Sequence, residues 1–170
     1  MIKLILIFTT FFFMDNFLVL LLPIQPLVGQ YQVVPNVFLT CLAMFVFFDK
    51  GNKPYWLALA FGLLYDIFYA GLLGLYPVLF VGTVFILRKY FVGITPINLF
   101  SMIFLMWGVI AVNQWVIYFL VLTMTASRMG FMHFVQYLLF PALLFNGIFM
   151  LATYPFLVSQ FRKYKKKFSG

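Results

Sequence analysis

The sequence is poor in the side chains that carry most enzyme chemistry. It contains no glutamate and only three aspartates, Asp15, Asp49 and Asp66, together with one histidine, His133, and one cysteine, Cys41. Catalysis by a carboxylate pair, by a nucleophile with its base or by a metal cluster needs several such groups close together. A single cysteine also excludes an intramolecular disulfide. We therefore expect a protein that is not an enzyme and that has no cofactor and no metal site.

Charge of either sign is scarce. Charged residues make up 8% of the 170 residues and hydrophobic residues 66%, and the mean hydropathy is +1.11. A soluble domain carries about 25% charged residues, so this chain could not cover a water-facing surface. The net charge of +8 lies in short clusters between long apolar runs, which is typical of the ends of membrane spans and not of a nucleic-acid interface. The composition predicts an integral membrane protein with no nucleic-acid partner.

Six apolar segments, each bounded by charge, proline or glycine, divide the chain. A transmembrane helix needs about 20 apolar residues, so these segments predict an all-α bundle of about six transmembrane helices. The bundle forms a single domain over residues 1–160, and residues 161–170 form a basic tail. The short stretch between the third and fourth segments predicts a tight hairpin. The segments are 4–22, 33–48, 55–72, 74–87, 98–123 and 132–158.

The distribution of lysine and arginine predicts the orientation. Cytoplasmic loops of membrane proteins are enriched in these residues. With a cytoplasmic N-terminus and six spans, only Arg128 falls on the outside, and the C-terminus is cytoplasmic as well. The basic residues that fall on the cytoplasmic side are Lys3, Lys50, Lys53, Arg88, Lys89, Arg162, Lys163, Lys165, Lys166 and Lys167.

Two aspartates lie inside apolar segments, whereas Asp49, beside Lys50 and Lys53, is typical of a solvated loop charge. A carboxylate within a membrane is costly and usually faces the bundle interior or a cavity. Asp15 and Asp66 fall at similar predicted depths, so the two could meet. For Asp66 three interpretations stay open: hydrogen bonding to the Gly71–Gly74 turn or a neighbouring helix, contact with a partner protein, and a proton or ion pathway.

Glycine is placed where it favours close helix packing. Gly62 precedes Asp66 by four residues, so the two share one face of a helix, and a glycine there lets another helix approach. We expect Gly62, Asp66, Gly71 and Gly74 to form a packing or partner-contact surface. Further polar positions within the apolar segments predict hydrogen bonds between helices, among them Asn36 and Asn146.

The stretch 61–82, FGLLYDIFYAGLLGLYPVLFVG, resembles the signature region of the rod shape-determining protein MreD family. The resemblance lies in Gly62-x-x-x-Asp66, an aromatic-rich step and a Leu-Leu-Gly turn that ends at Gly74. Weaker matches are Pro35-Asn36 at the second segment and FPALLFN, with Pro141 and Asn146, in the last one. An acidic residue in the first segment, Asp15, a basic tail, the length and the number of segments also fit the family.

This resemblance implies a non-enzymatic scaffold subunit of the bacterial cell-elongation complex, which supports peptidoglycan synthesis and cell shape in the cytoplasmic membrane. Its direct partner would be the bitopic protein MreC. Through MreC it would join MreB, a RodA-type glycosyltransferase and a class B penicillin-binding protein. The family's fold resembles that of the substrate-binding components of energy-coupling-factor vitamin transporters, which is the alternative function. The first segment contains no alanine or glycine for the docking pattern of those subunits, which argues against it.

The basic tail predicts a second kind of partner. Clustered lysine and arginine directly after a membrane span attract anionic lipid headgroups, at about 1 kcal/mol per residue. The alternative is that the tail serves only as an orientation signal. The residues predicted to contact lipid headgroups are Arg162, Lys163, Lys165, Lys166 and Lys167.

Overall fold

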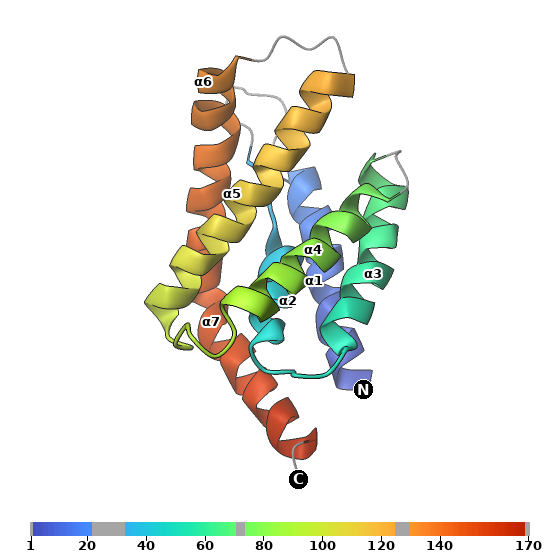
Figure 1. The fold of residues 1–170 in the computed structure, drawn as a ribbon, viewed down its shortest axis with the longest axis vertical. Coiled ribbons are helices and arrows are strands. Elements are labelled where there is room, and N and C mark those ends of the chain that lie inside the picture. The colour runs from blue at the N-terminus through green and yellow to red at the C-terminus, as the bar shows by residue number, and fades with distance from the viewer. Residues whose placement is uncertain (1, 22–32, 71–73, 125–129, 169–170) are drawn as a thin grey trace. The chain divides into compact units, whose positions relative to one another are not determined.

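The protein is helical throughout the part of the chain that its structure describes. The structure is a computed structural model, and it describes residues 2–21, 33–70, 74–124 and 130–168 (Figure 1). Within these ranges the chain forms helices joined by short connections, without a strand. The predicted all-α fold is confirmed.

The helical elements form six continuous segments over the described ranges, and two of these segments include a π-helical stretch. The π-helix η1 continues α3 without a break, and η2 joins α6 to α7 in the same way. The elements are α1 (Ile2–Leu21), α2 (Val37–Val46), α3 (Lys53–Tyr65), η1 (Asp66–Ala70), α4 (Leu75–Tyr90), α5 (Leu99–Met124), α6 (Phe131–Phe134), η2 (Val135–Leu139) and α7 (Phe140–Phe168).

Three helices are long and apolar enough to cross a membrane. They are Ile2–Leu21, Leu99–Met124 and the combined helix Phe131–Lys166. Val37–Val46 is a shorter apolar helix, in which all ten residues are buried. These lengths and compositions are those of a membrane protein.

The C-terminal basic residues belong to a helix. The last apolar segment was predicted to end at residue 158, but α7 continues to Phe168. Lysine and arginine are good helix formers, and positive charge is favourable near the C-terminal end of a helix. The basic residues therefore extend α7 instead of ending it.

The chain divides into two compact units. The first comprises residues 1–38 and 103–151, and the second residues 39–102 and 152–170. The first unit contains α1, most of α5, α6, η2 and the first part of α7. The second unit contains most of α2, α3, η1, α4 and the last part of α7.

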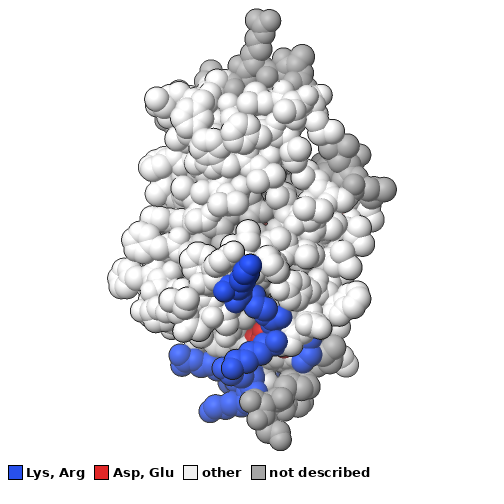
Figure 2. All heavy atoms as spheres, in the orientation of Figure 1, with Lys and Arg blue, Asp and Glu red and all other residues white. Residues whose placement is uncertain are grey.

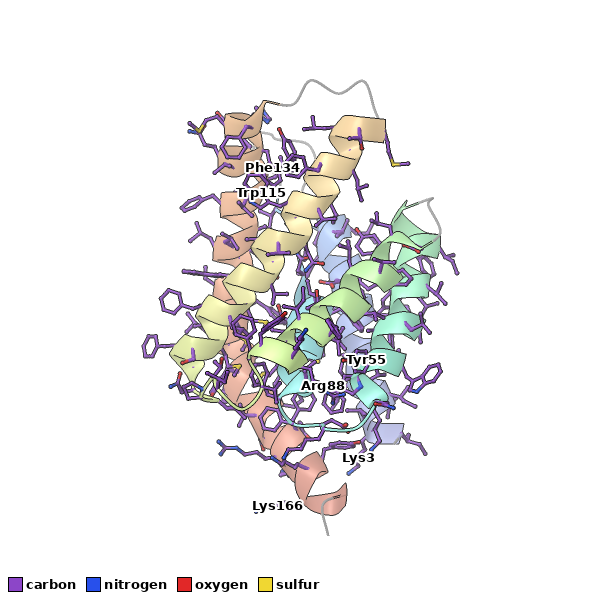
Figure 3. The ribbon with its side chains drawn as sticks, viewed as in Figure 1. Lys3, Tyr55, Arg88, Trp115, Phe134 and Lys166 are labelled. Carbon is purple, nitrogen blue, oxygen red and sulfur yellow. The ribbon has the colours of Figure 1, made fainter. Side chains whose placement is uncertain are left out.

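Aromatic side chains fill the first unit at one end of α5. The rings of Tyr118 and Phe134 stack with their centroids 4.3 Å apart. The rings of Trp115 and Phe134 meet edge-on, with their centroids 5.8 Å apart (Figure 3). Leu139 from η2 completes this buried cluster. Aromatic pairs in such arrangements stabilise helix packing beyond their buried area.

In the second unit α3 packs against α4. The ring of Tyr65, from α3, lies 5.3 Å from Tyr76 and 5.2 Å from Phe80, both from α4. The rings of Phe45 and Phe161 join α2 to the last part of α7, at 5.1 Å. Within the second unit these contacts therefore join α3 to α4 and α2 to the last part of α7.

Candidate functional site

A glycine allows α3 and α4 to approach each other. A Cβ atom built on Gly62 would lie 2.6 Å from Cα and 2.7 Å from the backbone nitrogen of Pro77, which is in the first turn of α4. These distances are shorter than any ordinary contact, and backbone atoms cannot turn away as a side chain can. Only glycine fits at position 62 in this packing.

The carboxylate of Asp66 binds the beginning of α4. One carboxylate oxygen accepts a hydrogen bond from the backbone N–H of Gly74, and the other accepts one from Tyr76 at 2.9 Å. The first N–H groups of a helix have no partner within the helix, and the helix dipole favours negative charge there. The side chain is 1% exposed. Of the three interpretations that the sequence left open, hydrogen bonding to the turn is the one that these contacts show.

The turn in front of α4 depends on Gly74. This residue is the N-cap of α4, and its φ of 106° is in the left-handed region, which favours glycine. Gly62, Asp66 and Gly74 thus all act on the start of α4. Gly62 lets α4 pack closely against α3, Gly74 forms the turn before α4, and Asp66 accepts hydrogen bonds from backbone N–H groups at its start. Gly71, also predicted to belong to this surface, lies outside the described residues.

Asp15 plays the same part in the first unit. It is buried in the middle of α1, and its two carboxylate oxygens accept hydrogen bonds from the backbone N–H groups of Val37, at 2.8 Å, and Phe38, at 2.9 Å. These residues begin α2. As with Asp66, a carboxylate from one helix accepts hydrogen bonds from the first backbone N–H groups of another.

Asn146 holds the chain that leads into α2. Its side-chain oxygen accepts a hydrogen bond from the backbone N–H of Asn36 at 2.8 Å, and its side-chain nitrogen donates to the carbonyls of Val34, at 3.1 Å, and Ala142, at 2.7 Å. The side chain of Asn36 donates to the Val34 carbonyl at 3.0 Å. Because residues 33–36 are not helical, their backbone groups need partners from elsewhere, and Asn146 supplies them for the Asn36 N–H and the Val34 carbonyl.

The structure gives Asp15 and Asp66 separate roles. Each carboxylate binds the backbone of a different helix start, α2 for Asp15 and α4 for Asp66, and the two belong to different units. Arg128, the one basic residue predicted to lie on the outside, is not among the described residues. A depth estimate from residue counts could not reveal the free N–H groups that these carboxylates bind.

Arg88 closes the turn before α3. Its guanidinium donates hydrogen bonds to the carbonyls of Asp49 and Gly51, both at 2.7 Å. It also lies over the ring of Tyr55, 5.2 Å from the centroid (Figure 3). The basic end of α4 is thereby fixed to the turn before α3.

Tyr164 of α7 joins the same turn. Its hydroxyl donates to the carboxylate of Asp49 at 3.0 Å and accepts a hydrogen bond from the ammonium of Lys53, which lies 3.6 Å from that carboxylate. The hydrogen bond to Tyr164 raises the pKa of Lys53 above its ordinary value. Asp49 is 7% exposed, so its interpretation as a solvated loop charge is wrong. The sequence could not predict these contacts of Asp49, because its partners Arg88 and Tyr164 are distant in sequence.

The remaining basic residues of α7 separate into two groups. An open groove of about 440 Å³ is lined by Tyr154, Pro155, Val158, Ser159, Arg162, Lys163 and Lys166. Lys165 instead lines a pocket of about 370 Å³ beside Asp49 and Tyr164. Figure 2 shows basic side chains gathered on one part of the surface. The side chain of Lys167 lies outside the described residues.

Comparison with known proteins does not assign the chain to a family. A scan against protein-family models, a search of curated proteins and a search of solved structures each found no match. Within the described ranges, no group of three or more His, Cys, Asp or Glu side chains is placed to hold a metal ion.

Proposed function

We propose that this chain is a non-enzymatic scaffold subunit of a bacterial cell-elongation complex, of the MreD type. It would lie in the cytoplasmic membrane and bind a bitopic membrane protein similar to MreC. Through that protein it would act with MreB, a RodA-type glycosyltransferase and a class B penicillin-binding protein. Its role would be to hold partner helices in place and not to turn over a substrate.

The observation that carries this proposal is the closed hairpin of α3, η1 and α4. The residues of the MreD-like pattern, Gly62, Asp66 and Gly74, all act on the start of α4. Both oxygens of the Asp66 carboxylate are engaged by backbone N–H groups, which is a structural use of an intramembrane acid. A hairpin closed in this way keeps one shape, as a scaffold surface must.

The outer side of the hairpin suits a helix from a partner. Exposed apolar residues recur along α3 and η1 at the spacing of one helix face, and a small residue, Ala60, lies among them. Membrane helices associate by close packing, which small residues favour, and a bitopic protein offers one such helix. The exposed large apolar residues of α3 and η1 are Trp56, Leu59, Leu63, Leu64, Ile67 and Phe68.

Span lengths support six crossings. The α2 helix has ten residues, about 15 Å, and the four residues of the non-helical stretch 33–36 add about 13 Å if extended. Their sum approaches the hydrocarbon thickness of about 30 Å. Irregular backbone is tolerated at such depth where protein groups satisfy it, as Asn146 does here. The 18 residues of α3 and η1 reach about 27 Å.

Partner retention tests the proposed function. We expect the tagged chain, purified from a rod-shaped bacterium in mild detergent, to retain an MreC-like bitopic protein. The matched comparison is Leu63→Asn with Ile67→Asn, on the exposed hairpin face, against Phe100→Asn with Phe104→Asn, on the exposed face of α5. The hairpin pair should lose most of the partner and the α5 pair should keep it. Retention of a vitamin-transporter energising module instead would favour the alternative function.

Cysteine labelling tests the orientation. Three basic clusters, around Lys53, at the end of α4 and at the end of α7, meet around Asp49, which supports a common cytoplasmic side. In a Cys41→Ser background, we expect single cysteines near positions 29 and 128 to react with a membrane-impermeant maleimide in intact cells. A cysteine at Asn52 should react only after the cells are opened. Labelling at Asn52 in intact cells would refute the model with both termini inside.

A further inference from the structure

We propose that the groove along α7 binds the phosphate of an anionic phospholipid, with Arg162, Lys163 and Lys166 as the phosphate-binding residues. This assigns a phosphate-binding site to three of the five basic residues near the C-terminal end of α7. The inference rests on the membrane placement of α7, and it does not depend on the scaffold role.

The groove has an apolar end and a cationic end. Pro155 and Val158 lie at the first, Arg162 and Lys166 at the second, and Ser159 lies between them. From Tyr154 to Lys166 the helix rises about 18 Å, which covers a phospholipid headgroup and the upper part of its acyl chains. The Tyr154 hydroxyl donates to the carbonyl of Ile97 at 3.0 Å, which fixes its ring at the apolar end.

The cationic end carries charge that no side chain of the described residues neutralises. Every aspartate of the chain is described, and none forms an ion pair with Arg162, Lys163 or Lys166; the ion pair in the described structure joins Lys53 to Asp49. Arg88 and Lys53 are engaged with backbone carbonyls and with Tyr164. The three groove residues are therefore free to bind an external anion.

The combination of the two ends selects a lipid among phosphate compounds. A free phosphate or a phosphorylated metabolite would use only the cationic end and would leave the exposed ring of Pro155 uncovered. A phospholipid places its phosphate at the arginine and lysines and its glycerol and acyl carbons against the apolar end. A position at the membrane–water interface suits this arrangement, because the α7 sequence changes from apolar to basic along the groove.

Lipid binding by the full-length chain in detergent tests this site. Native mass spectrometry would follow the titration of phosphatidylglycerol, with phosphatidylcholine as the neutral lipid. We expect selective binding of phosphatidylglycerol, weakened by salt. The triple variant Arg162→Gln, Lys163→Gln, Lys166→Gln should bind it at least about tenfold more weakly. The charge-matched variant Lys50→Gln, Lys89→Gln, Lys165→Gln removes three positive charges outside the groove and should bind it about as well as the unaltered chain.

Three results would overturn the proposal. Equal loss in both triple variants would mean that only total charge matters. Equal binding of the two lipids would mean that the phosphate-binding residues do not select an anion. Full competition by millimolar glycerol phosphate would identify a soluble phosphate compound as the ligand. Thermal unfolding of each variant without lipid checks that it is folded, and partner retention, measured separately, tests the scaffold role on its own.

Discussion

Alanine at position 62 is expected to open the α3–α4 hairpin and to destabilise the protein strongly. The added Cβ would lie 2.6 Å from Cα of Pro77, so one helix must move. Inserting a methyl group into a packed site costs about 1–3 kcal/mol, and more where the neighbour is backbone. Moving α4 would also lengthen the hydrogen bonds that Asp66 makes to Gly74 and Tyr76. We expect a large drop in the thermal unfolding midpoint in detergent and a loss of the retained partner.

The matched control is Gly82→Ala. Gly82 is also in α4, but a Cβ there would meet no atom within 4 Å. Alanine in a helix interior is favoured over glycine by about 0.5–1 kcal/mol, so this variant should be as stable as the unaltered chain or slightly more stable. If Gly62→Ala behaved like Gly82→Ala, the close approach of the two helices would not hold the hairpin together, and the structural basis of the proposed scaffold would fail.

Much of the fold could be predicted because the responsible forces are local in sequence. Runs of apolar residues ended by Lys, Pro or Gly predict helices, and each predicted segment contains or overlaps a helix of the structure. The glycine-bounded turn before α4 predicts the hairpin. The α7 helix continues beyond the predicted apolar segment, because charge marks a membrane boundary but does not end a helix: Arg162 to Phe168 remain helical.

The site was predictable to the extent that its partners are close in sequence. Asp66 lies eight residues before Gly74, so a hydrogen bond to the turn was one of the interpretations that the sequence offered. The partners of Asp15 lie 22 and 23 residues away, and Asn36 and Asn146 are 110 residues apart. Such pairs depend on how helices pack, which periodicity and composition do not specify. Asp49 was misinterpreted for the same reason.

A common use of the aspartates emerges from these contacts. Asp15 binds the first N–H groups of α2 and Asp66 those at the start of α4, while Asp49 accepts a hydrogen bond from Gly51, at 2.6 Å, in the turn before α3. In a membrane, free N–H groups at a helix start lack water to bind and cost several kcal/mol each. Asp15 and Asp66 therefore bind N–H groups where helices begin, and Asp49 binds the turn that leads into α3.

Asp66 should tolerate asparagine better than leucine. The amide oxygen of asparagine can accept one of the two backbone N–H groups, whereas its NH₂ group cannot accept the other. Leucine leaves both donors of Gly74 and Tyr76 unpaired, at about 1–3 kcal/mol for each. The expected order of thermal stability and of partner retention is Asp, then Asn, then Leu, with the larger step between Asn and Leu because asparagine also removes a costly charge from the membrane.

The same pair of variants separates a structural carboxylate from a functional charge. A proton carrier or an ion-pair partner requires the ionisable group itself, so asparagine and leucine would then abolish function alike while leaving different stabilities. Restoration of rod shape in cells that lack the native protein, measured with partner retention and with membrane levels of each variant, gives the decisive comparison. Equal loss of shape in Asp66→Asn and Asp66→Leu at normal membrane levels would show that the charge acts beyond the hairpin. A graded loss that follows stability would assign Asp66 to the closure of α3 on α4, because the number of satisfied N–H groups falls stepwise along that series, whereas the charge is lost entirely at the first step.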